Sequence, residues 1–438
     1  MCEVRSGIES MKLLIKNGNL IDPVLKSEQI TDILIEDGQI AAIGEALEDS
    51  EAQVLEASGL AVAPGLIDMH VHFRDPGYTY KEDILTGAAA AARGGFTAVA
   101  CMPNTKPAVD SPEMVSYVFE RAAQGCGVHV LPIAAVSMGE RGEQLTDAKA
   151  LKQAGAVALS DDGMPVQNAN LMRDALICAH RQGLVVLSHC EDADMVKNYA
   201  VNEGRISRQL GIPGRPAIAE EIMVMRDAML AEETQTAVHI CHISTGRAVD
   251  IVRKYKKKGV KITCETCPQY FTLNQSEILK QGAMARVNPP LRTTRDVAAV
   301  LAGLKDGTID CIVTDHAPHS EEEKARGLEQ APSGMVGLET SLAVSLTQLY
   351  HTGEMTLPEI IAKMTIQPAR LLGLEKGRLS VGRAADLTLF DPDEEWVVDA
   401  SQFASKGRNT PFDGWKLKGK VKYTIVDGKM IYQDGGQG

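Results

Sequence analysis

No apolar run in this sequence approaches the roughly 18 residues that a membrane-spanning helix needs. The first ten residues, MCEVRSGIES, have no apolar core segment and are not expected to be a signal peptide. Positive charge is also in deficit, because 45 lysines and arginines stand against 58 aspartates and glutamates, a formal charge of −13. This balance disfavours a nucleic-acid or anionic-membrane surface, but it allows an anionic substrate in a locally positive pocket.

Disulfide and dinucleotide-binding patterns are missing as well. The nine cysteines are an odd number, and most lie within apolar runs, which is typical of reduced thiols in a cytoplasmic protein. Cys264 and Cys267 form a CxxC pair, but no second pair accompanies it, so we do not expect a structural zinc site there. Neither GxGxxG nor a Walker A sequence occurs, which leaves a doubly wound nucleotide-binding sheet without support.

Two hydrophobic patterns divide the chain. Short strand-like segments with NG and DG turns occupy 11–60 and 377–438, so both ends are expected to build one small β-sandwich domain, with 1–10 as a loose extension. Between them, in 61–376, apolar strand candidates alternate with helical stretches. The candidates are 60–72, 97–104, 127–136, 156–163, 183–192, 236–244, 261–269 and 310–319. This alternation predicts an α/β fold, a (β/α)8 TIM-like barrel.

Each strand candidate ends in polar residues, and barrel enzymes carry their chemistry at these carboxyl ends. The first ends in His70 and His72, whose i, i+2 spacing puts both imidazoles on one face of a strand. The other ends contribute Asp161, Asp162, His189, His242, Asp315, His316 and His319. Such imidazoles and carboxylates at one mouth suit zinc or a similar ion, and so many ligands are better explained by two ions sharing a carboxylate. One carboxylate is then left as a proton shuttle.

A plainer interpretation exists for each residue taken alone. A single histidine can be a satisfied core residue, and we assign His129, His180, His239 and His351 to that class. Asp161 and Asp162 can form a solvated turn. The ordered combination along the strands is more specific than any single member, and it favours the metal site.

Several motifs carry a resemblance over the chain from residue 11 onward. They are GLIDMHVHFRDPG, CMPNTKP, LSDDGMPV, LSHCED, HICHIST, NPPLR, TDHAPHS and NTPFDGWKLKGKV. In these motifs the sequence resembles the amidohydrolase superfamily and, within it, the type I dihydroorotase family. The resemblance implies a zinc enzyme that reversibly converts N-carbamoyl-L-aspartate to L-dihydroorotate in pyrimidine biosynthesis.

The resemblance also assigns metal ligands. It implies that His70, His72 and Asp315 hold one zinc and that His189 and His242 hold a second. Many superfamily members bridge the ions with a carboxylated lysine, but AVALSDDG contains no lysine. We therefore expect Asp162 and a hydroxide to bridge two zinc ions, with Asp161 as the alternative bridge. Asp315 is expected to be the catalytic proton shuttle.

Substrate contacts follow from the same resemblance. The planar fork of Arg74 suits a carboxylate that takes no part in bond making, and Asn104 and His319 are expected on that same carboxylate. Asn288 is expected at the ring amide, and Pro332, Ser333 and Gly334 are expected to close over the substrate, with His72 also near it. The plainer alternatives are that Asn104 caps a helix or turn and that Arg74 pairs with Asp75.

Rival functions remain open at this point. Dihydropyrimidinase, hydantoinase and allantoinase are cyclic amide hydrolases of the same superfamily, but they typically keep the strand lysine and have no reason for a carboxylate clamp. A non-catalytic scaffold for a carbamoyltransferase is the alternative of another class, although such relatives usually lose metal ligands. We expect a small-molecule substrate and a homodimer, with a carbamoyltransferase as a possible partner and no nucleic-acid or membrane partner.

Overall fold

Eight parallel strands form the centre of the computed structural model, which describes residues 12–435. Their order is β6 (Leu66–Val71), β7 (Phe96–Cys101), β8 (His129–Ala135), β9 (Ala158–Ser160), β10 (Val186–Ser188), β13 (Val238–Ile240), β14 (Ile262–Thr266) and β15 (Cys311–Ile312). The ring closes between β6 and the chain after β15, where Val71 pairs with His316 and the Asp68 carboxylate accepts the Thr314 N–H. Each strand overlaps one predicted segment, so the barrel prediction is confirmed.

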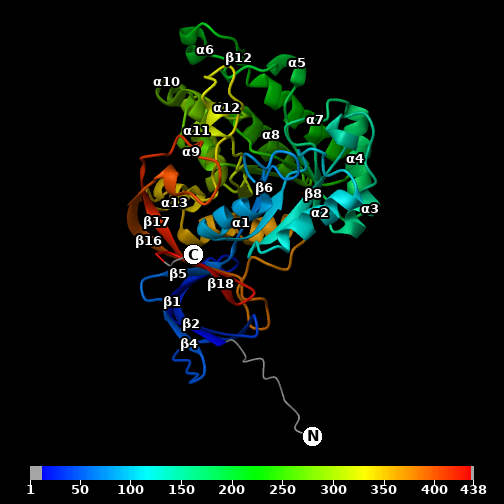
Figure 1. The fold of residues 1–438 in the computed structure, drawn as a ribbon. Helices are drawn as coiled ribbons and strands as arrows, with labels where there is room; N and C mark the ends of the chain where they lie inside the picture. Colours follow the sequence, from blue (N-terminus) through cyan, green and yellow to red (C-terminus); the bar gives the residue numbers. More distant parts are fainter. Residues whose placement is uncertain (1–11, 436–438) are drawn as a thin grey trace.

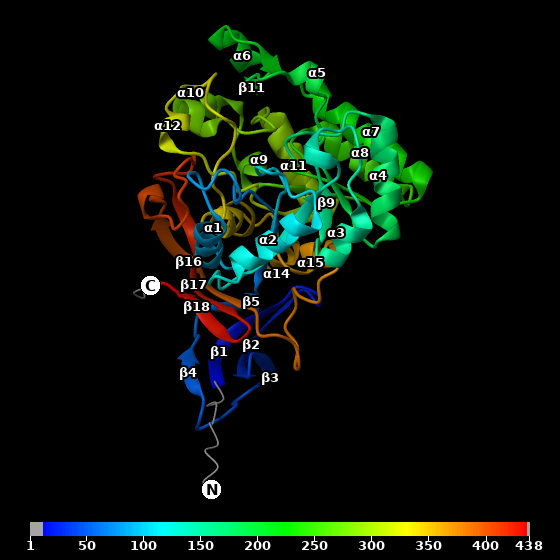
Figure 2. The same cartoon turned by 45° about the vertical axis from the view of Figure 1, so that its right-hand side comes forward.

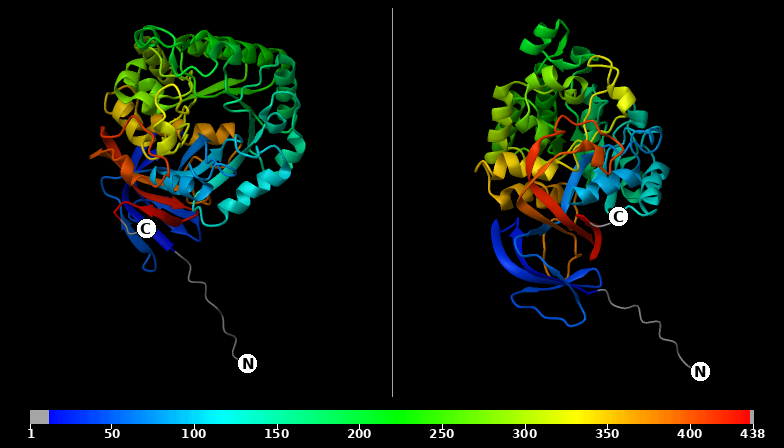
Figure 3. Two further views of the ribbon diagram at one scale, coloured as in Figure 1. Left: turned by 45° about the horizontal axis from the view of Figure 1, so that its top comes forward. Right: turned by 60° about the vertical axis from the view of Figure 1, so that its left-hand side comes forward.

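Helices surround these strands, as the ring in the left view of Figure 3 shows. They are α1 (Ile84–Arg93), α2 (Pro112–Ala122), α3 (Ala148–Ala154), α4 (Ala169–Arg181), α7 (Ile218–Thr234), α8 (Gly246–Lys257), α11 (Thr294–Lys305), α13 (Ser341–Ser345), α14 (Leu357–Lys363) and α15 (Ile366–Leu371). Their starts are set locally by side chains that accept orphan backbone N–H groups. Asp83 accepts from Leu85 and Thr86 at α1, and Ser111 accepts from Met114 at α2, where a proline follows.

Short elements gather on one side of the barrel because they follow the carboxyl ends of the strands. They are α5 (Ala193–Val196), β11 (Val201–Asn202), α6 (Arg205–Leu210), β12 (Gly214–Arg215), α9 (Pro268–Thr272), α10 (Ile278–Gln281), α12 (Glu321–Lys324) and 3-10 turns at 138–140, 275–277 and 282–285. Several of them lie at the top of Figure 1. This side is therefore the mouth at which the chemistry was predicted.

A second sheet takes strands from both ends of the chain, as expected, and Figures 1 and 2 show its blue and red strands together below the barrel. Its order is β3 (Gln39–Gly44), β2 (Ser27–Glu36), β1 (Lys12–Asp22), β5 (Ala61–Pro64), β16 (Leu387–Val397), β17 (Lys416–Val426) and β18 (Lys429–Gln433), and β4 (Gln53–Glu56) also pairs with β1. All these strands belong to one sheet. The sheet is curled, because a bridge between Gln39 and Ala384 brings β3 beside the chain just before β16. Ile15, Ile33 and Leu387 are in the core that it encloses.

The segment predicted as a single strand at 60–72 divides at Gly65. β5 belongs to the curled sheet and β6 to the barrel. A Cβ atom at Gly65 would lie 2.1 Å from the Thr97 side-chain oxygen, and the Gly65 N–H donates to Asp386 O. Glycine is therefore needed where one sheet passes into the other.

The division into a small β domain (11–60 plus 377–438) and a barrel domain (61–376) stays a prediction. The expectation for residues 1–10 lies outside the described residues. In the part of the chain that is described, no helix is long and apolar enough to cross a membrane.

Candidate metal centre

The predicted metal ligands all lie at or just beyond the carboxyl ends of barrel strands. His70 is the last residue but one of β6, and His72 follows that strand. Asp162 follows β9, His189 follows β10, His242 follows β13, and Asp315 follows β15. All six residues are buried, with exposed fractions of 7% or less.

Asp162 lies at the centre of four imidazoles. Its Oδ1 atom is 3.5 Å from His70 Nε2, 3.3 Å from His189 Nδ1 and 3.4 Å from His242 Nε2. Its Oδ2 atom is 3.4 Å from His72 Nε2. Asp162 is thus shared by one potential ligand group with His70 and His72 and another with His189 and His242.

The neighbouring Asp161 is turned away from this cluster. Its Oδ1 atom accepts the Val136 N–H at 2.8 Å and the Ser137 N–H at 3.1 Å, and its Oδ2 atom accepts the Ser137 hydroxyl. These contacts tie the chain after β9 to the chain after β8. The two adjacent carboxylates therefore have different partners.

The cluster fits a divalent metal ion. His70 Nε2 and Asp162 Oδ1 are buried atoms without a hydrogen-bond partner among residues 12–435. Bonds of about 2.0–2.2 Å in a tetrahedral zinc site place ligand atoms roughly 3.3–3.5 Å apart. The distances around Asp162 lie in that range. Imidazole nitrogens and a carboxylate are also the ligand types that such ions prefer.

Charge in the cluster favours an ionised Asp162. Burial raises its pKa, but the imidazoles of His70, His189 and His242 outweigh burial and hold the pKa well below its usual range. A second carboxylate, that of Asp315, lies next to the same two histidines that face Asp162 from the end of β6. Its Oδ1 atom is 3.1 Å from His72 Nε2 and 3.6 Å from His70 Nε2.

Backbone conformation at the site is unusual. Asp315 has φ of 49°, His242 has φ of 31° and Arg74 has φ of 60°. Non-glycine residues rarely adopt this left-handed region, and such strain concentrates at functional sites.

Hydrogen bonds at Nδ1 fix the ring orientations of His70 and His72. His70 Nδ1–H donates to Glu265 Oε1 at 2.6 Å, and the other oxygen of Glu265 accepts His239 Nε2–H at 3.1 Å. His72 Nδ1–H donates to Asn104 Oδ1 at 2.9 Å. In both rings Nε2 is thereby the nitrogen that faces Asp162 and is available to a metal ion.

Arg74 reaches the mouth without an ionic partner. Its Nε–H donates to Pro318 O at 3.4 Å, and within residues 12–435 it forms no ion pair. Asp75 is bound instead by Arg121 Nε at 3.2 Å and by the Tyr117 hydroxyl at 2.7 Å. Pairing with Asp75 is therefore not what Arg74 does in this structure.

His319 and the 332–334 segment lie against each other. His319 Nε2–H donates to Ser333 O at 2.8 Å, and Nδ1 accepts from Lys81 Nζ at 3.3 Å. Burial, followed by the charges of Arg74 and Lys81, lowers the His319 pKa far below its usual value, so the ring is neutral. Gly334 packs close to His319, since a Cβ atom there would lie 3.0 Å from His319 Nε2.

Asn288 lies on the other side of the cluster. Its Nδ2 atom is 3.4 Å from His189 Nε2, and its Oδ1 atom accepts from Arg215. Arg215 also pairs with Glu191 at 2.8 Å.

Asn104, besides its bond to His72, donates to Asp162 O at 3.2 Å. All the predicted site residues are thus near the mouth, and Asn104, Asn288 and His319 already have side-chain or backbone partners there, unlike the Arg74 fork.

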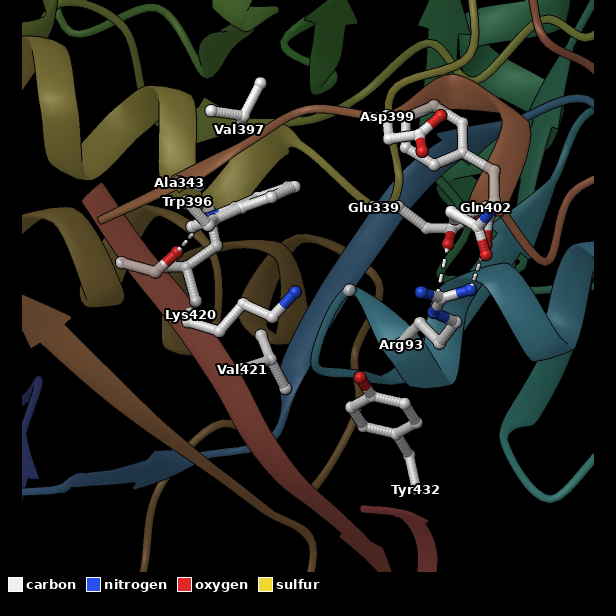
Figure 4. A pocket seen from close by; sticks show the side chains of 14 residues that line it. Arg93, Glu339, Ala343, Trp396, Val397, Asp399, Gln402, Lys420, Val421 and Tyr432 are labelled. Carbon is white, nitrogen blue, oxygen red and sulfur yellow. Dashed lines mark hydrogen bonds and ion pairs between the residues drawn. The ribbon is translucent and has the colours of Figure 1, made fainter. Parts of the chain in front are cut away.

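A separate cavity of about 270 Å³ lies between α1, β16 and β17, and Figure 4 shows Arg93, Glu339 and Trp396 lining it. None of the predicted site residues lines this cavity.

Cys264 and Cys267 are buried and free, and no metal-ligand group among residues 12–435 includes either of them. The CxxC pair is therefore not part of a candidate metal site.

The sequence interpretation missed Glu265 and Lys324. Glu265 is fully buried inside β14, and the available signal was a carboxylate within an otherwise apolar strand of a sheet that is buried on both faces. Lys324 is 3% exposed, yet it stands in the run SEEEK, whose composition suggests a solvated helix start. Nothing in that run indicated its burial.

A closed parallel barrel with histidines and aspartates converging at its mouth defines a metal-dependent amidohydrolase. A family model described as Dihydro-orotase-like matches residues 59–248. A dihydroorotase of Pelotomaculum thermopropionicum is 51% identical over 97% of this chain and 99% of its own length. One of Acetivibrio thermocellus is 49% identical over 96% of this chain and 99% of its own. The chain belongs to the dihydroorotase family.

Solved structures agree on the architecture. The L-hydantoinase (dihydropyrimidinase) from Arthrobacter aurescens superposes with a TM-score of 0.87 at 27% identity, covering 97% of this chain and 96% of that one. The chain therefore has the same fold as this hydantoinase.

Proposed function

We propose that the protein is a zinc-dependent dihydroorotase, which interconverts L-dihydroorotate and N-carbamoyl-L-aspartate in pyrimidine biosynthesis. The observation that carries the proposal is Arg74, a guanidinium without an ionic partner in the described chain, beside a cluster that fits metal ions. A cyclic amide with an extra carboxylate is the substrate that uses both features. The names of the full-length relatives support the same substrate.

Two zinc ions are proposed at the mouth. His70, His72 and Asp315 would hold one, His189 and His242 would hold the other, and Asp162 would bridge them. When bound, such ions polarise a carbonyl group and activate water as a nucleophile at neutral pH. The sharing of Asp162 between two ligand groups supports this arrangement.

Asp315 is the proposed proton shuttle. In the hydrolytic direction its carboxylate takes a proton from the attacking water and gives it to the departing ring nitrogen. In the cyclising direction it takes a proton from the attacking nitrogen and returns it to the departing oxygen. The distance of 3.1 Å between Asp315 Oδ1 and His72 Nε2, beside the proposed metal ligands, supports this role.

The rest of the mouth binds and orients. We propose that Arg74 pairs with the substrate carboxylate through a bidentate contact, with Asn104 and His319 beside it. Asn288 would contact the ring amide, and Ser333 and Gly334 would cover the substrate. Asn104 and His319 would have to exchange present partners for substrate, whereas Arg74 has a free fork.

Further parts of the proposal concern the molecule in the cell. We propose a cytoplasmic homodimer with a carbamoyltransferase as candidate partner, and a small domain of 11–60 and 377–438 beside a barrel domain of 61–376. Light scattering of the purified chain, alone and mixed with a carbamoyltransferase, tests the assembly.

The main test is a substrate panel. The purified zinc-loaded protein is given L-dihydroorotate, hydantoin, dihydrouracil and allantoin in parallel, and its zinc content is measured alongside. We expect turnover of dihydroorotate and little of the uncharged rings. Rapid turnover of hydantoin or allantoin with none of dihydroorotate would refute the proposal in favour of the hydantoinase-type alternative.

A further inference from the structure

The segment from Pro332 to Gly334 is fixed in place by residues from three directions. Besides the bond from His319 to Ser333 O, the Arg286 Nε–H donates to Ser333 Oγ at 3.2 Å. The Gly334 N–H donates to Arg286 O at 2.9 Å. The segment therefore depends on the position of residue 286, which lies outside the barrel strands and just after the 3-10 turn at 282–285.

Lys324 connects these pieces. Its ammonium group donates to Ala283 O at 2.9 Å, to Arg286 O at 3.3 Å and to Pro332 O at 3.0 Å. A lysine ammonium has three N–H donors, and here three carbonyl groups use all of them. One side chain thus joins α12, the turn at 282–285 and the start of the Pro332–Gly334 segment.

No carboxylate shares this task. Lys324 is 3% exposed and forms no ion pair with any residue of the described range 12–435. The adjacent Glu323 is turned away, with its carboxylate 2.8 Å from Lys81 Nζ and accepting the Tyr80 hydroxyl. A buried ammonium is costly unless it is hydrogen-bonded. Burial, followed by the charge of Arg286, lowers the Lys324 pKa to about 7, so the charged form depends on the three carbonyl groups.

We propose that Lys324 is a positioning residue for substrate binding, which sets the Pro332–Gly334 segment against His319 at the mouth of the barrel. This inference rests on the proposed function, because it takes that segment to cover the substrate. Lys324 itself does not touch the substrate; it acts through the backbone of residues 286 and 332.

The position of Lys324 predicts which kinetic constant changes. The metal ligands and Asp315 stand on barrel strand ends, and Lys324 contacts none of them. A displaced covering segment weakens the binding of substrate and transition state alike, which raises KM with little change in kcat. A change in the metal site would instead lower kcat.

The experiment compares three variants of the full zinc-loaded chain. Lys324→Met keeps the length and removes all donors, and Lys324→Gln keeps a shorter neutral donor. Lys280→Met is the matched control, because Lys280 is exposed on α10 and, among the described residues, pairs only with Glu277. We expect KM for dihydroorotate to rise about ten-fold or more in Lys324→Met, less in Lys324→Gln and not in the control, at unchanged zinc content.

A second readout is independent of turnover. Hydrogen exchange followed by mass spectrometry should show faster exchange in peptides covering 331–336 in both Lys324 variants, with the strand-end peptides around His70 and His189 unchanged. If both variants keep wild-type KM and wild-type exchange at 331–336, the inference is wrong. If the wild-type protein does not turn over dihydroorotate, the proposed function fails, while the exchange data still decide whether Lys324 positions the segment.

Discussion

The two adjacent aspartates after β9 offer a direct test, because alanine at each position should have an opposite effect. Asp161→Ala leaves the buried N–H and hydroxyl groups of Ser137 without their acceptor, whereas the Val136 N–H keeps Ser160 O at 3.2 Å. A buried donor without a partner costs about 1–3 kcal/mol, so the two together cost about 2–6 kcal/mol of folding free energy. The metal ligands keep their side chains, and zinc should remain bound.

Asp162→Ala removes the carboxylate that four imidazoles share. Loss of a residue that merely orients a ligand lowers metal affinity about 10- to 100-fold, so loss of a shared ligand should exceed about 100-fold. Folding should suffer less than in Asp161→Ala, because Asp162 accepts no backbone N–H through its side chain within residues 12–435.

The assay pairs zinc analysis after dialysis against a weak chelator with thermal unfolding of the metal-free proteins. Asp162→Ala should lose zinc and keep the metal-free unfolding temperature, and Asp161→Ala should do the reverse. Zinc loss in Asp161→Ala together with zinc retention in Asp162→Ala would refute the assignment of Asp162 as the bridge.

Two further predictions concern other charged residues. Arg74→Ala should lower kcat/KM for dihydroorotate about 100-fold or more at normal zinc content, because a bidentate carboxylate contact carries two charged hydrogen bonds of about 1.5–3 kcal/mol each; zinc loss in this variant would make the arginine structural. Glu140 is a pH probe, since burial, followed by the charges of Asp161 and Asp162, raises its pKa from 4.5 to about 9. Between these two values the folded protein holds a proton that the unfolded chain has released, so the free energy of unfolding falls as pH rises. Glu140→Gln removes this decline, and denaturant titrations at pH 6 and pH 9 should show its stability gain over wild type growing with pH; an equal gain at both pH values would contradict the assignment.

Hydrophobic alternation was sufficient to predict the barrel, because strands buried on both faces stand out against the helices between them. It was not sufficient to divide 60–72 into β5 and β6, since apolar residues continue across Gly65 and only the contact with Thr97 reveals the junction. The i, i+2 spacing that puts His70 and His72 on one strand face does not continue as far as Arg74. The structure ends β6 at Val71 and turns Arg74 to φ of 60°, a tertiary effect that no local pattern encodes.

The candidate site followed from the same rule in part. Residue types at strand ends identified the ligand candidates, because strand ends of a barrel converge whatever the sequence between them. The partners that orient them could not be predicted in this way. Glu265 lies 195 residues after His70 in the sequence and 26 residues after His239, and only the register of β13 and β14 brings these side chains together.

The absence of the strand lysine raises a question of reach, because an aspartate is far shorter than a carboxylated lysine. The contacts of residues 161 and 162 supply an answer. Asp161 is bound to the backbone of Val136 and Ser137 after β8, and Asp162 O accepts from Asn104 after β7. The backbone at the proposed bridge is thus held from the side of the two preceding strands, at a point where a two-carbon side chain meets all four imidazoles. On this proposal Asp161 holds the backbone in place and does not bind a metal ion. A protein that bridges metal ions with a short side chain needs such a neighbour to fix the backbone. The substitution Asp162→Lys should therefore not support zinc binding, because the longer lysine side chain would start from a backbone position that suits aspartate.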